Sequence, residues 1–508
     1  MYANAGAQIV VIPPATLQLD STVIQGCDFM WSGIYLDQKA TVKILEHSVL
    51  RDAETAIYAS NKSNHYIIDS SIEDCVKGVY LPQNSSGNSI SSFIWGSHFG
   101  MVASNLKPGY PGQPIFGSIP YSGIELNDVT LDIGVTSQDS NWFNNLNSGV
   151  LGFRSSLRVR NNKFENIRSD TAIIFNDWHG AAVASIGKIN QIPGKLAVRP
   201  LNSTGWTMEN CQTGIFTLYS TLDAYQVTMT EMLSGVKSQN CYLSSSVSYC
   251  NIEAERYGID WRLNSGASLM NASRNTITMS GSIHGIGINL EEASTAGVPN
   301  YVVEENYNIS ITSGMAGIRA SNVYDPQIQD NTVIQNSNGT DFPETIGILL
   351  ENCDTGLVKC NTIISTDITY TSTYGMRVRA TNGTTISCNQ VDSNQVGFRF
   401  SELSVLNLSS NTMTNNFWGL EIDSLSYIGI QKHKGNRWVN YRDTVGAVNW
   451  DTTGTFLLSS LFRTSGLPLS VYYPAIPSWN NGWFVTQFGT EERCGPTCTI
   501  EALTDSSE

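Results

Sequence analysis

A short phrase recurs along the second half of this 508-residue chain and limits the folds that the chain can adopt. Each copy consists of an Asn-x-apolar triplet, a polar gap, and a glycine followed by an apolar residue. The clearest copies pair Asn275 with Gly287, Asn331 with Gly347, Asn361 with Gly375, Asn389 with Gly397 and Asn411 with Gly419. Repeats of about 20 to 50 residues are typical of solenoids, in which each unit is too small to bury its own apolar face. We therefore expect a stack of small units.

The residues that follow the glycine indicate that the units are built from β-strands. In Gly419-Leu-Glu-Ile-Asp423 apolar and polar residues alternate. A period of two directs the first and third residues after the glycine inward and the second and fourth outward. The asparagine suits a tight turn, because its short amide tolerates left-handed backbone, and stacked asparagines can form a ladder of amides. We predict an all-β chain that forms a right-handed parallel β-helix.

The glycine, or an alanine in its place, can be followed upstream to predict the coils. The predicted positions are Gly33, Ala56, Gly78, Gly100, Gly123, Gly149, Ala172, Gly214, Gly235, Gly258, Gly287, Gly317, Gly347, Gly375, Gly397 and Gly419. The gap between Ala172 and Gly214 is close to two units, so one more coil is expected near residue 193. This spacing predicts about 17 coils. We divide the chain into N-terminal entry rungs at 1–32, the β-helix at 33–440, and a C-terminal cap and linker-like tail at 441–508.

Composition excludes several classes of partner. The chain has 29 basic and 44 acidic residues, a net charge of −15, which argues against nucleic acid as a partner because phosphate contacts need a basic surface. No stretch approaches the about 18 apolar residues of a membrane span. The six histidines are scattered, and neither a zinc-protease motif nor a Gly-rich calcium nonapeptide occurs. We predict no metal site and no cofactor, with Ca²⁺ expected only if the protein is a lyase.

Five of the ten cysteines occupy positions that suggest a role, and they fall into two groups. Cys250, Cys360 and Cys388 each precede an asparagine of the repeat, and we interpret them as small apolar residues stacked in the core. Cys494 and Cys498 lie in a polar tail, where their spacing suits a local disulfide or half of a metal site. Because no second cysteine pair or nearby histidine completes a zinc site, we predict the disulfide, which would imply an oxidising compartment.

Three tyrosines occupy the outward position two residues after the glycine or alanine in the first coils: Tyr35, Tyr58 and Tyr80. Stacked coils would bring the three rings into a column. Exposed aromatic rings form platforms for the C–H faces of sugars, so we predict substrate binding here. The alternative is a cross-strand ladder of residues with high β propensity that only covers the sheet.

Arginine and acidic residues occupy the outward positions of later coils. Arg319, Arg377 and Arg399 stand two residues after their glycines, and Glu351 and Arg379 stand four residues after theirs. Such a surface could bind an acidic polysaccharide and supply a base, with Arg377, Arg399 and Glu351 as catalytic candidates and Arg319 and Arg379 as substrate-binding residues. The alternative is a set of surface ion pairs, each worth about 0 to 1 kcal/mol.

Over roughly residues 9–440 the repeat resembles right-handed parallel β-helix proteins of the pectate-lyase-like superfamily. The opening residues 15–20, Cys27, 30–34 and 53–57 are similar to large secreted surface proteins of Bacteroidetes-type bacteria. That resemblance implies a signal peptide and a sorting domain for type IX secretion, both outside this sequence. The chain begins almost inside a strand, so we expect it to be part of a longer protein.

The superfamily includes lyases, polygalacturonase-like hydrolases and non-catalytic members. The hydrolases use an Asp-Asp pair and a Gly-His-Gly motif, whereas this chain has no adjacent aspartates and only Ile283-His284-Gly285. The lyases use Arg or Lys with calcium-binding carboxylates, for which Arg377 and Arg399 with Glu351 are the nearest match. We predict a secreted or cell-surface, non-catalytic module for adhesion or polysaccharide binding. The alternative is a lyase or glycoside hydrolase acting on an acidic polysaccharide.

Overall fold

The computed structural model describes most of the chain. The residues outside the description are 61, 83–91, 110–118, 135–139, 170–177, 189–193, 201–206, 242, 265–268, 282–283, 292–299, 313, 337–343, 367–371, 425, 452–453, 455, 466–469, 478–481, 496–499 and 503–508. Contacts divide the chain into two compact units, Met1–Ile252 and Glu253–Glu508, which are described separately.

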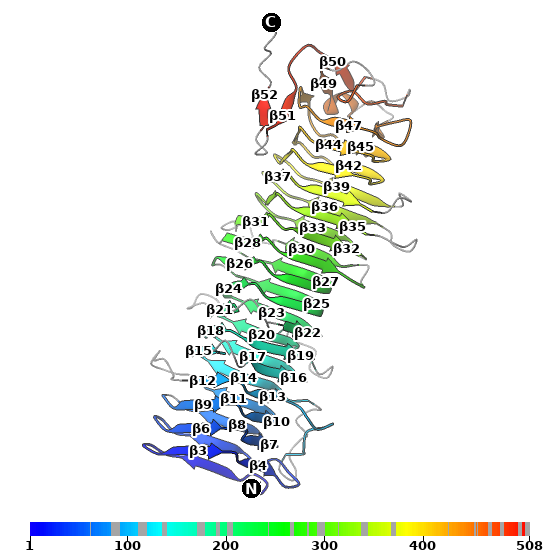
Figure 1. Cartoon of the computed structure of the whole chain (residues 1–508). Helices are drawn as coiled ribbons and strands as arrows, with labels where there is room; N and C mark the ends of the chain where they lie inside the picture. Colours follow the sequence, from blue (N-terminus) through cyan, green and yellow to red (C-terminus); the bar gives the residue numbers. More distant parts are fainter. Residues whose placement is uncertain are drawn as a thin grey trace. The chain divides into compact units, whose positions relative to one another are not determined.

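Within each unit, parallel strands from successive coils pair into long sheets (Figure 1). We call the sheet that carries the repeat's glycine the glycine ladder. In the first unit its strands are β2 (Gln8–Val11), β5 (Gly33–Leu36), β8 (Thr55–Ala59), β11 (Lys77–Leu81), β14 (Ser122–Asn127), β17 (Ser148–Phe153), β20 (Ala181–Ile186), β23 (Thr213–Leu218) and β25 (Thr228–Gln239). In the second unit they are β27 (Asn251–Arg262), β30 (Ile286–Glu291), β33 (Ala316–Ser321), β36 (Thr345–Glu351), β39 (Thr373–Arg379), β42 (Val396–Ser401), β45 (Trp418–Ile422) and β48 (Ala447–Asn449).

Two further faces complete each coil. The face before the glycine ladder in each coil contains β4 (Val23–Gly26), β7 (Val49–Arg51), β10 (Ser71–Glu73), β13 (His98–Gly100), β16 (Asn141–Asn144), β19 (Asn162–Glu165) and β22 (Thr207–Glu209) in the first unit, and β29 (Thr276–Met279), β32 (Asn308–Ile311), β35 (Thr332–Gln335), β38 (Thr362–Ser365), β41 (Gln390–Asp392), β44 (Thr412–Thr414) and β47 (Arg437–Val439) in the second. The third face contains β3 (Thr16–Asp20), β6 (Thr41–Leu45), β9 (Asn64–Ile68), β12 (Ser92–Trp95), β15 (Thr130–Ile133), β18 (Ser156–Val159), β21 (Gly194–Val198), β24 (Ser220–Tyr225) and β26 (Ser245–Ser248), then β28 (Leu269–Ser273), β31 (Asn300–Glu304), β34 (Gln327–Gln329), β37 (Leu357–Lys359), β40 (Thr385–Ser387) and β43 (Asn407–Ser409).

The predicted parallel β-helix is confirmed in both units. Among the described residues the helical structure is one 3₁₀ turn, Leu457–Ser460. The residues directly after the glycines, such as Ile318, Ile348 and Phe398, are fully buried, as the alternation predicts. Because each strand pairs with its equivalents in neighbouring coils, these side chains form continuous apolar columns inside the coils. No helix in the described part of the chain is long and apolar enough to cross a membrane.

The strand register shortens the predicted list of coils. Val79 pairs directly with Ile124, so Gly78 is followed in the ladder by Gly123, and Gly100 belongs to β13 on another face. Ala182, the residue before Val183, follows Gly149, since Val150 pairs with Val183. The predicted positions at Ala172 and near residue 193 lie outside the described residues. The series from Gly33 to Gly419 therefore has about 15 coils rather than 17. One coil, from Gly78 to Gly123, spans 45 residues, and the 65 residues from Gly149 to Gly214 form two coils where three were predicted.

The predicted asparagine ladder is present, although its geometry differs from the expectation. The side-chain amide of Asn331 donates to Oδ1 of Asn361 (2.9 Å), and that of Asn361 donates to Oδ1 of Asn389 (3.0 Å). The left-handed residue is the one before each asparagine, such as Cys360 with φ 59° and Ser410 with φ 56°. The asparagine itself is buried and links the coils through hydrogen bonds.

The cysteines correct two expectations. Cys388 forms a disulfide with Cys494, so the predicted local bond from Cys494 to Cys498 is wrong, and Cys498 lies outside the described residues. Cys388 and Cys360 occupy left-handed turn positions, and Cys360 is also disulfide-bonded, so neither is a free core residue. Cys250 is buried, as expected, and follows the left-handed Tyr249. It therefore occupies the position that an asparagine takes in other coils.

The C-terminal segment packs an aromatic group onto the last coils. Strands β46 (Gln431–Lys432), β49 (Phe462–Thr464) and β50 (Phe484–Thr486) form a small parallel sheet. Phe462 and Phe484 stack with ring centroids 4.7 Å apart, and Trp483 is fully buried beside them. The Trp438 ring of β47 contacts Phe484 at 5.5 Å. The strands β51 (Glu492–Cys494) and β52 (Ile500–Ala502) form an antiparallel hairpin.

Candidate functional site

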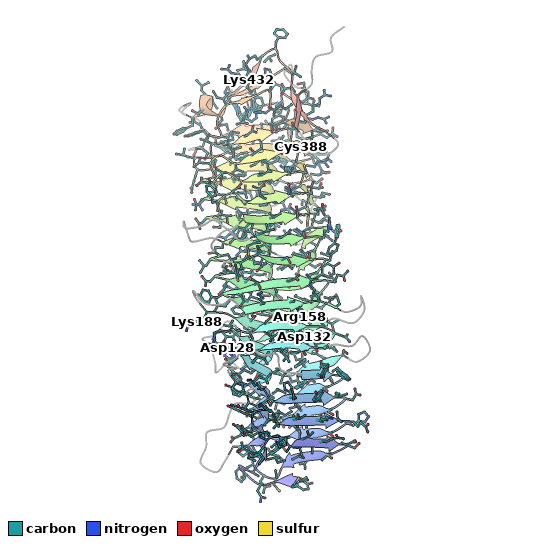
Figure 2. All side chains as sticks on the ribbon, turned by 90° about the vertical axis from the view of Figure 1, so that its left-hand side faces the viewer. Asp128, Asp132, Arg158, Lys188, Cys388 and Lys432 are labelled. Carbon is teal, nitrogen blue, oxygen red and sulfur yellow. A yellow bond between two sulfur atoms is a disulfide. The ribbon has the colours of Figure 1, made fainter. Side chains whose placement is uncertain are left out.

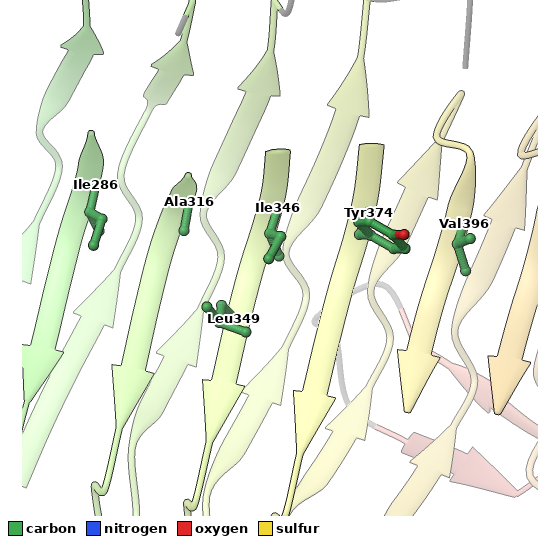
Figure 3. Close-up of a cluster of buried hydrophobic side chains, with 6 residues drawn as sticks. All are labelled: Ile286, Ala316, Ile346, Leu349, Tyr374 and Val396. Carbon is green, nitrogen blue, oxygen red and sulfur yellow. The ribbon is translucent and has the colours of Figure 1, made fainter. Parts of the chain in front are cut away.

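The glycine ladder of the second unit carries a second row of apolar side chains on its outer side, and these side chains are also buried. Ile346 pairs with Tyr374, and Ile348 pairs with Met376. These pairs lie on either side of the ladder glycines Gly347 and Gly375. Ile348 points into the core, whereas Leu349 points outward. Figure 3 shows the resulting outer apolar cluster along β30, β33, β36, β39 and β42. Its members are Ile286, Ala316, Ile346, Leu349, Tyr374 and Val396.

Arg399 is the centre of a polar group beside this apolar cluster. Its guanidinium donates to the hydroxyl of Tyr374 at 2.8 Å and lies 5.2 Å from the centroid of that ring. It also contacts Asp423 at 3.3 Å and Glu421 at 3.7 Å. Burial lowers the pKa of Arg399, but the two carboxylates outweigh burial and leave the pKa above its ordinary value. Arg399 therefore stays protonated and is poorly suited to act as a base.

Glu421 connects this arginine to two tryptophans. Oε1 of Glu421 accepts a hydrogen bond from Nε1 of Trp450 at 2.8 Å, and the side chain is almost fully buried. Burial raises the pKa of Glu421, and Arg399 opposes this shift. The Trp450 ring is 37 % exposed and lies 5.9 Å from Trp418, whose Nε1 donates to Asp443 at 2.8 Å. An exposed indole beside fixed carboxylate and guanidinium groups can stack on a sugar ring and bind its hydroxyls.

The structure separates the predicted catalytic candidates into different ion pairs. Arg377 lies opposite Arg399 on the neighbouring strand, but it pairs with Glu344. Glu351 pairs with Arg319 at 3.1 Å. The predicted substrate-binding residue Arg379 pairs with Glu402 at 2.6 Å, on a more exposed part of the surface. Each of these arginines already contacts a carboxylate.

Among the described residues, carboxylates also outnumber arginines on this face. The arginines are Arg262, Arg319, Arg377, Arg379 and Arg399, and their ion-pair partners are Asp260, Glu291, Glu344, Glu351, Glu402, Glu421 and Asp423. A face with more carboxylates than guanidinium groups repels polyanions at moderate salt. The charge therefore suits an uncharged chain of sugars better than an acidic one.

The tyrosine column of the first unit is present, with its rings packed against one another. Tyr35 and Tyr58 are stacked at 5.0 Å, and Tyr58 meets Tyr80 edge-on at 5.4 Å. The ammonium group of Lys77 lies 4.5 Å from the Tyr80 centroid. Stacked rings cover each other's faces, so the column presents mainly ring edges and hydroxyl groups outward. Sugar binding here remains a prediction that would depend on hydroxyl hydrogen bonds more than on stacking.

Sequence reasoning missed three residues of the second unit's site. Tyr374 and Trp418 directly precede Gly375 and Gly419, and a scan of the residue before each glycine would have found them. Trp450 follows the last clear copy of the repeat and had no such signal. In the described part of the chain, no three His, Cys, Asp or Glu side chains are arranged to hold a metal ion.

A second polar cluster lies in the first unit, on the face before the glycine ladder. Glu73 bonds to Arg51, and its Oε1 lies 3.6 Å from Nδ1 of His98. Nε2 of His98 lies 2.8 Å from Oδ1 of Asn144, and the imidazole packs on Trp142 at 4.8 Å. The His98 hydrogen bond lowers the pKa of Glu73 to about 2, with help from Arg51 and against burial.

This shift predicts a pH dependence of stability. A carboxyl group with a lowered folded pKa stabilises the protein above its ordinary pKa of 4.5, and this contribution disappears as the pH falls toward about 2. We expect Glu73→Gln to flatten the loss of unfolding free energy between about pH 5 and pH 2. Urea unfolding at each pH, followed by tryptophan fluorescence, measures this free energy. Glu46→Gln, at an exposed turn, is the control, and equal slopes for Glu73→Gln and wild type would contradict the prediction.

Comparisons with known proteins agree with the fold. A family model described as a right handed beta helix region matches residues 15–185. This match lies in the first part of the chain and agrees with the right-handed parallel β-helix fold of the structure. A search of curated proteins returned no match.

The solved structures that match this chain do so at low identity and low TM-score. The periplasmic alginate epimerase AlgG is 10 % identical with a TM-score of 0.31, covering 82 % of this chain and 76 % of AlgG. The Dettilon tailspike protein gp208 is 12 % identical with a TM-score of 0.26, covering 75 % and 59 %. The A-module of the Azotobacter vinelandii mannuronan C-5 epimerase AlgE6 is 11 % identical with a TM-score of 0.25, covering 80 % and 91 %. At these values we draw no conclusion about activity.

Proposed function

We propose that this chain is a polysaccharide-binding module that contacts an uncharged polysaccharide through the outer face around Arg399 and Trp450. The observation that carries the proposal is the partly exposed Trp450 ring, whose Nε1 is fixed by Glu421 beside the Arg399 guanidinium. An aromatic face next to oriented hydrogen-bonding groups is the combination that sugars require. The excess of carboxylates on this face supports a neutral ligand.

The same geometry supports binding without catalysis. Arg377, Arg399 and Glu351 each contact an oppositely charged group and belong to separate ion pairs. A lyase or hydrolase needs an acid and a base that converge on one bond. Ion pairing instead holds these side chains in fixed positions, as a binding surface requires. The tyrosine column is a second proposed contact.

We also propose an extracellular or cell-surface location. The disulfide between Cys388 and Cys494 and the bonded state of Cys360 support it, because disulfides persist in oxidising compartments. Type IX secretion is part of this proposal through the sequence resemblance alone.

The test is binding of the purified chain to neutral glucans, mannans and xylans and to acidic alginate and pectate. We expect Trp450→Ala to weaken binding of the preferred neutral polymer by about 2 kcal/mol, or about thirtyfold, since exposed tryptophans often dominate binding energy. Phe93→Ala is the control, because Phe93 is a similarly exposed aromatic residue, at 38 %, in the first unit. Equal loss in both variants, or alginate or pectate binding that exceeds binding of the neutral polymers and is weakened by Trp450→Ala, would contradict the proposal.

A second candidate is a glycoside hydrolase at the same face. One observation favours it. Burial raises the pKa of Glu421, which would help a general acid to keep its proton, and Asp423 contacts the same guanidinium group, that of Arg399. If this candidate is correct, shorter chains will accumulate with wild-type protein, and Glu421→Gln will bind the polymer without shortening it.

A further inference from the structure

A polar pocket of about 320 Å³ lies in the second unit, between the face before the glycine ladder and the C-terminal hairpin. Strands β41, β44 and β47 contribute its wall, and β51 closes one side. The lining residues are Gln390, Ser410, Thr412, Gly435, Arg437, Tyr472, Arg493 and Cys494. The volume is in the lower range of small-molecule sites and exceeds what a lone oxyanion needs.

The hairpin is fixed against the coils by several contacts. The disulfide joins Cys494 of β51 to Cys388, which Figure 2 labels at the edge of the coils. The buried carboxylate of Glu491 accepts the backbone N–H of Gly435 at 2.9 Å. Gly435 has φ 62°, and a Cβ there would lie 1.7 Å from the carbonyl oxygen of Glu492, so only glycine permits this approach. The wall that carries Arg493 is therefore held in place.

The charges in this pocket differ from those on the outer face of the glycine ladder. Among the described side chains, no carboxylate pairs with Arg437 or Arg493. The acidic residues beside them are already bonded, Glu492 to Lys434 at 3.0 Å and Glu491 to Gly435. Glu501 is the backbone register partner of Arg493 in the hairpin. The pocket is a local positive site on a chain of net charge −15.

We propose that this pocket binds a sugar unit that carries one carboxylate or sulfate group. The guanidinium groups of Arg437 and Arg493 hold the anion, since guanidinium matches the geometry of both groups. Gln390, Thr412 and Tyr472 bind the hydroxyls and the ring. The site does not depend on the proposed function, because it uses none of the residues around Trp450.

The test is isothermal titration with glucuronate, glucose 6-sulfate, glucose and inorganic sulfate at about 0.15 M salt, where long-range repulsion is screened beyond about 8 Å. We expect one or both acidic sugars to bind and glucose to bind at least about tenfold more weakly, and Arg437→Gln to lose at least about tenfold in affinity. A double variant, Cys388→Ser with Cys494→Ser, should also weaken binding, because it releases the wall that carries Arg493.

The control is Arg158→Gln, which removes an arginine paired with Asp132 in the first unit (Figure 2). The proposal is overturned if neither acidic sugar binds wild-type protein, or if Arg437→Gln binds as tightly as Arg158→Gln. Inorganic sulfate that binds as tightly as glucose 6-sulfate would overturn the assignment of a sugar. Failure of Trp450→Ala to change polysaccharide binding would affect only the proposed function.

Discussion

Replacing Gly375 with alanine is expected to lower the free energy of unfolding by about 3 kcal/mol, because the added methyl group has no space. A Cβ at this position would lie 2.1 Å from Cγ1 of Val391 and 2.6 Å from the carbonyl oxygen of Gly397. Val391 is a buried core residue, and Gly397 belongs to the backbone of the next coil. Neither can move without disturbing the pairing of β39 with β42.

Urea unfolding of wild type and Gly375→Ala, followed by tryptophan fluorescence, measures this loss. Ala56→Gly is the reverse control, since Ala56 occupies the equivalent position in the first unit and its methyl group is accommodated. Its expected cost is about 1 kcal/mol from added backbone freedom. If Gly375→Ala stays within about 0.5 kcal/mol of wild type, steric exclusion does not explain why glycine recurs in the phrase.

Replacing Asn361 with alanine is the second large effect, also expected to cost about 3 kcal/mol or more. Oδ1 of Asn361 accepts both the backbone N–H (3.1 Å) and the side-chain amide (2.9 Å) of Asn331. Its own amide donates to the carbonyl of Ile328, to that of Lys359 and to Oδ1 of Asn389. All but the hydrogen bond to the Lys359 carbonyl are buried, so the substitution leaves several donors and acceptors without partners.

The same unfolding measurement tests this ladder. Asn382→Ala is the matched control, because Asn382 is an exposed asparagine whose Oδ1 accepts one backbone N–H, that of Val405. It should cost no more than about 1 kcal/mol. Equal losses of unfolding free energy in the two variants would show that the buried amides contribute no more to stability than a surface turn does.

The sequence predicts the coils of the second unit well and those of the first less well, for a physical reason. From Gly258 to Gly419 every glycine of the ladder was found, because each must avoid the side chain and carbonyl that a Cβ would meet. Gly100 fits the spacing of the ladder glycines, but a different contact requires a glycine there. Gly100 lies on the face before the glycine ladder, and a Cβ there would meet Oδ1 of its register partner Asn144 in β16. A glycine required by one face cannot be distinguished by spacing from a glycine required by another.

The turns and the disulfide show a similar limit. Asparagine was expected to adopt the left-handed conformation, yet Cys360, Cys388 and Ser410 adopt it and the next residue forms the ladder. Cys494 lies 106 residues from Cys388 in the chain, and only the position of the hairpin beside the coils brings them together. Spacing predicts local pairs and carries no information on such a contact.

For the candidate site, alternation predicted which arginines point outward but not their partners. The interpretation of Arg319 and Glu351 as an ion pair was one of two alternatives, and the 3.1 Å contact agrees with it. Arg399 and Glu421 pair across adjacent strands in the same way. Trp450 reaches the site from beyond the repeat, where no periodicity predicts position.

The most direct test of non-catalytic polysaccharide binding is incubation of the purified chain with the panel of neutral and acidic polysaccharides. Bound polymer is measured by co-sedimentation, and released sugars are measured by mass spectrometry. We predict that a neutral polysaccharide is retained by wild-type protein, is retained much less by Trp450→Ala, and remains full length. Shortened chains, or products with a terminal double bond, that appear with wild type and disappear with Glu421→Gln or Arg399→Ala would contradict this prediction and assign an enzyme.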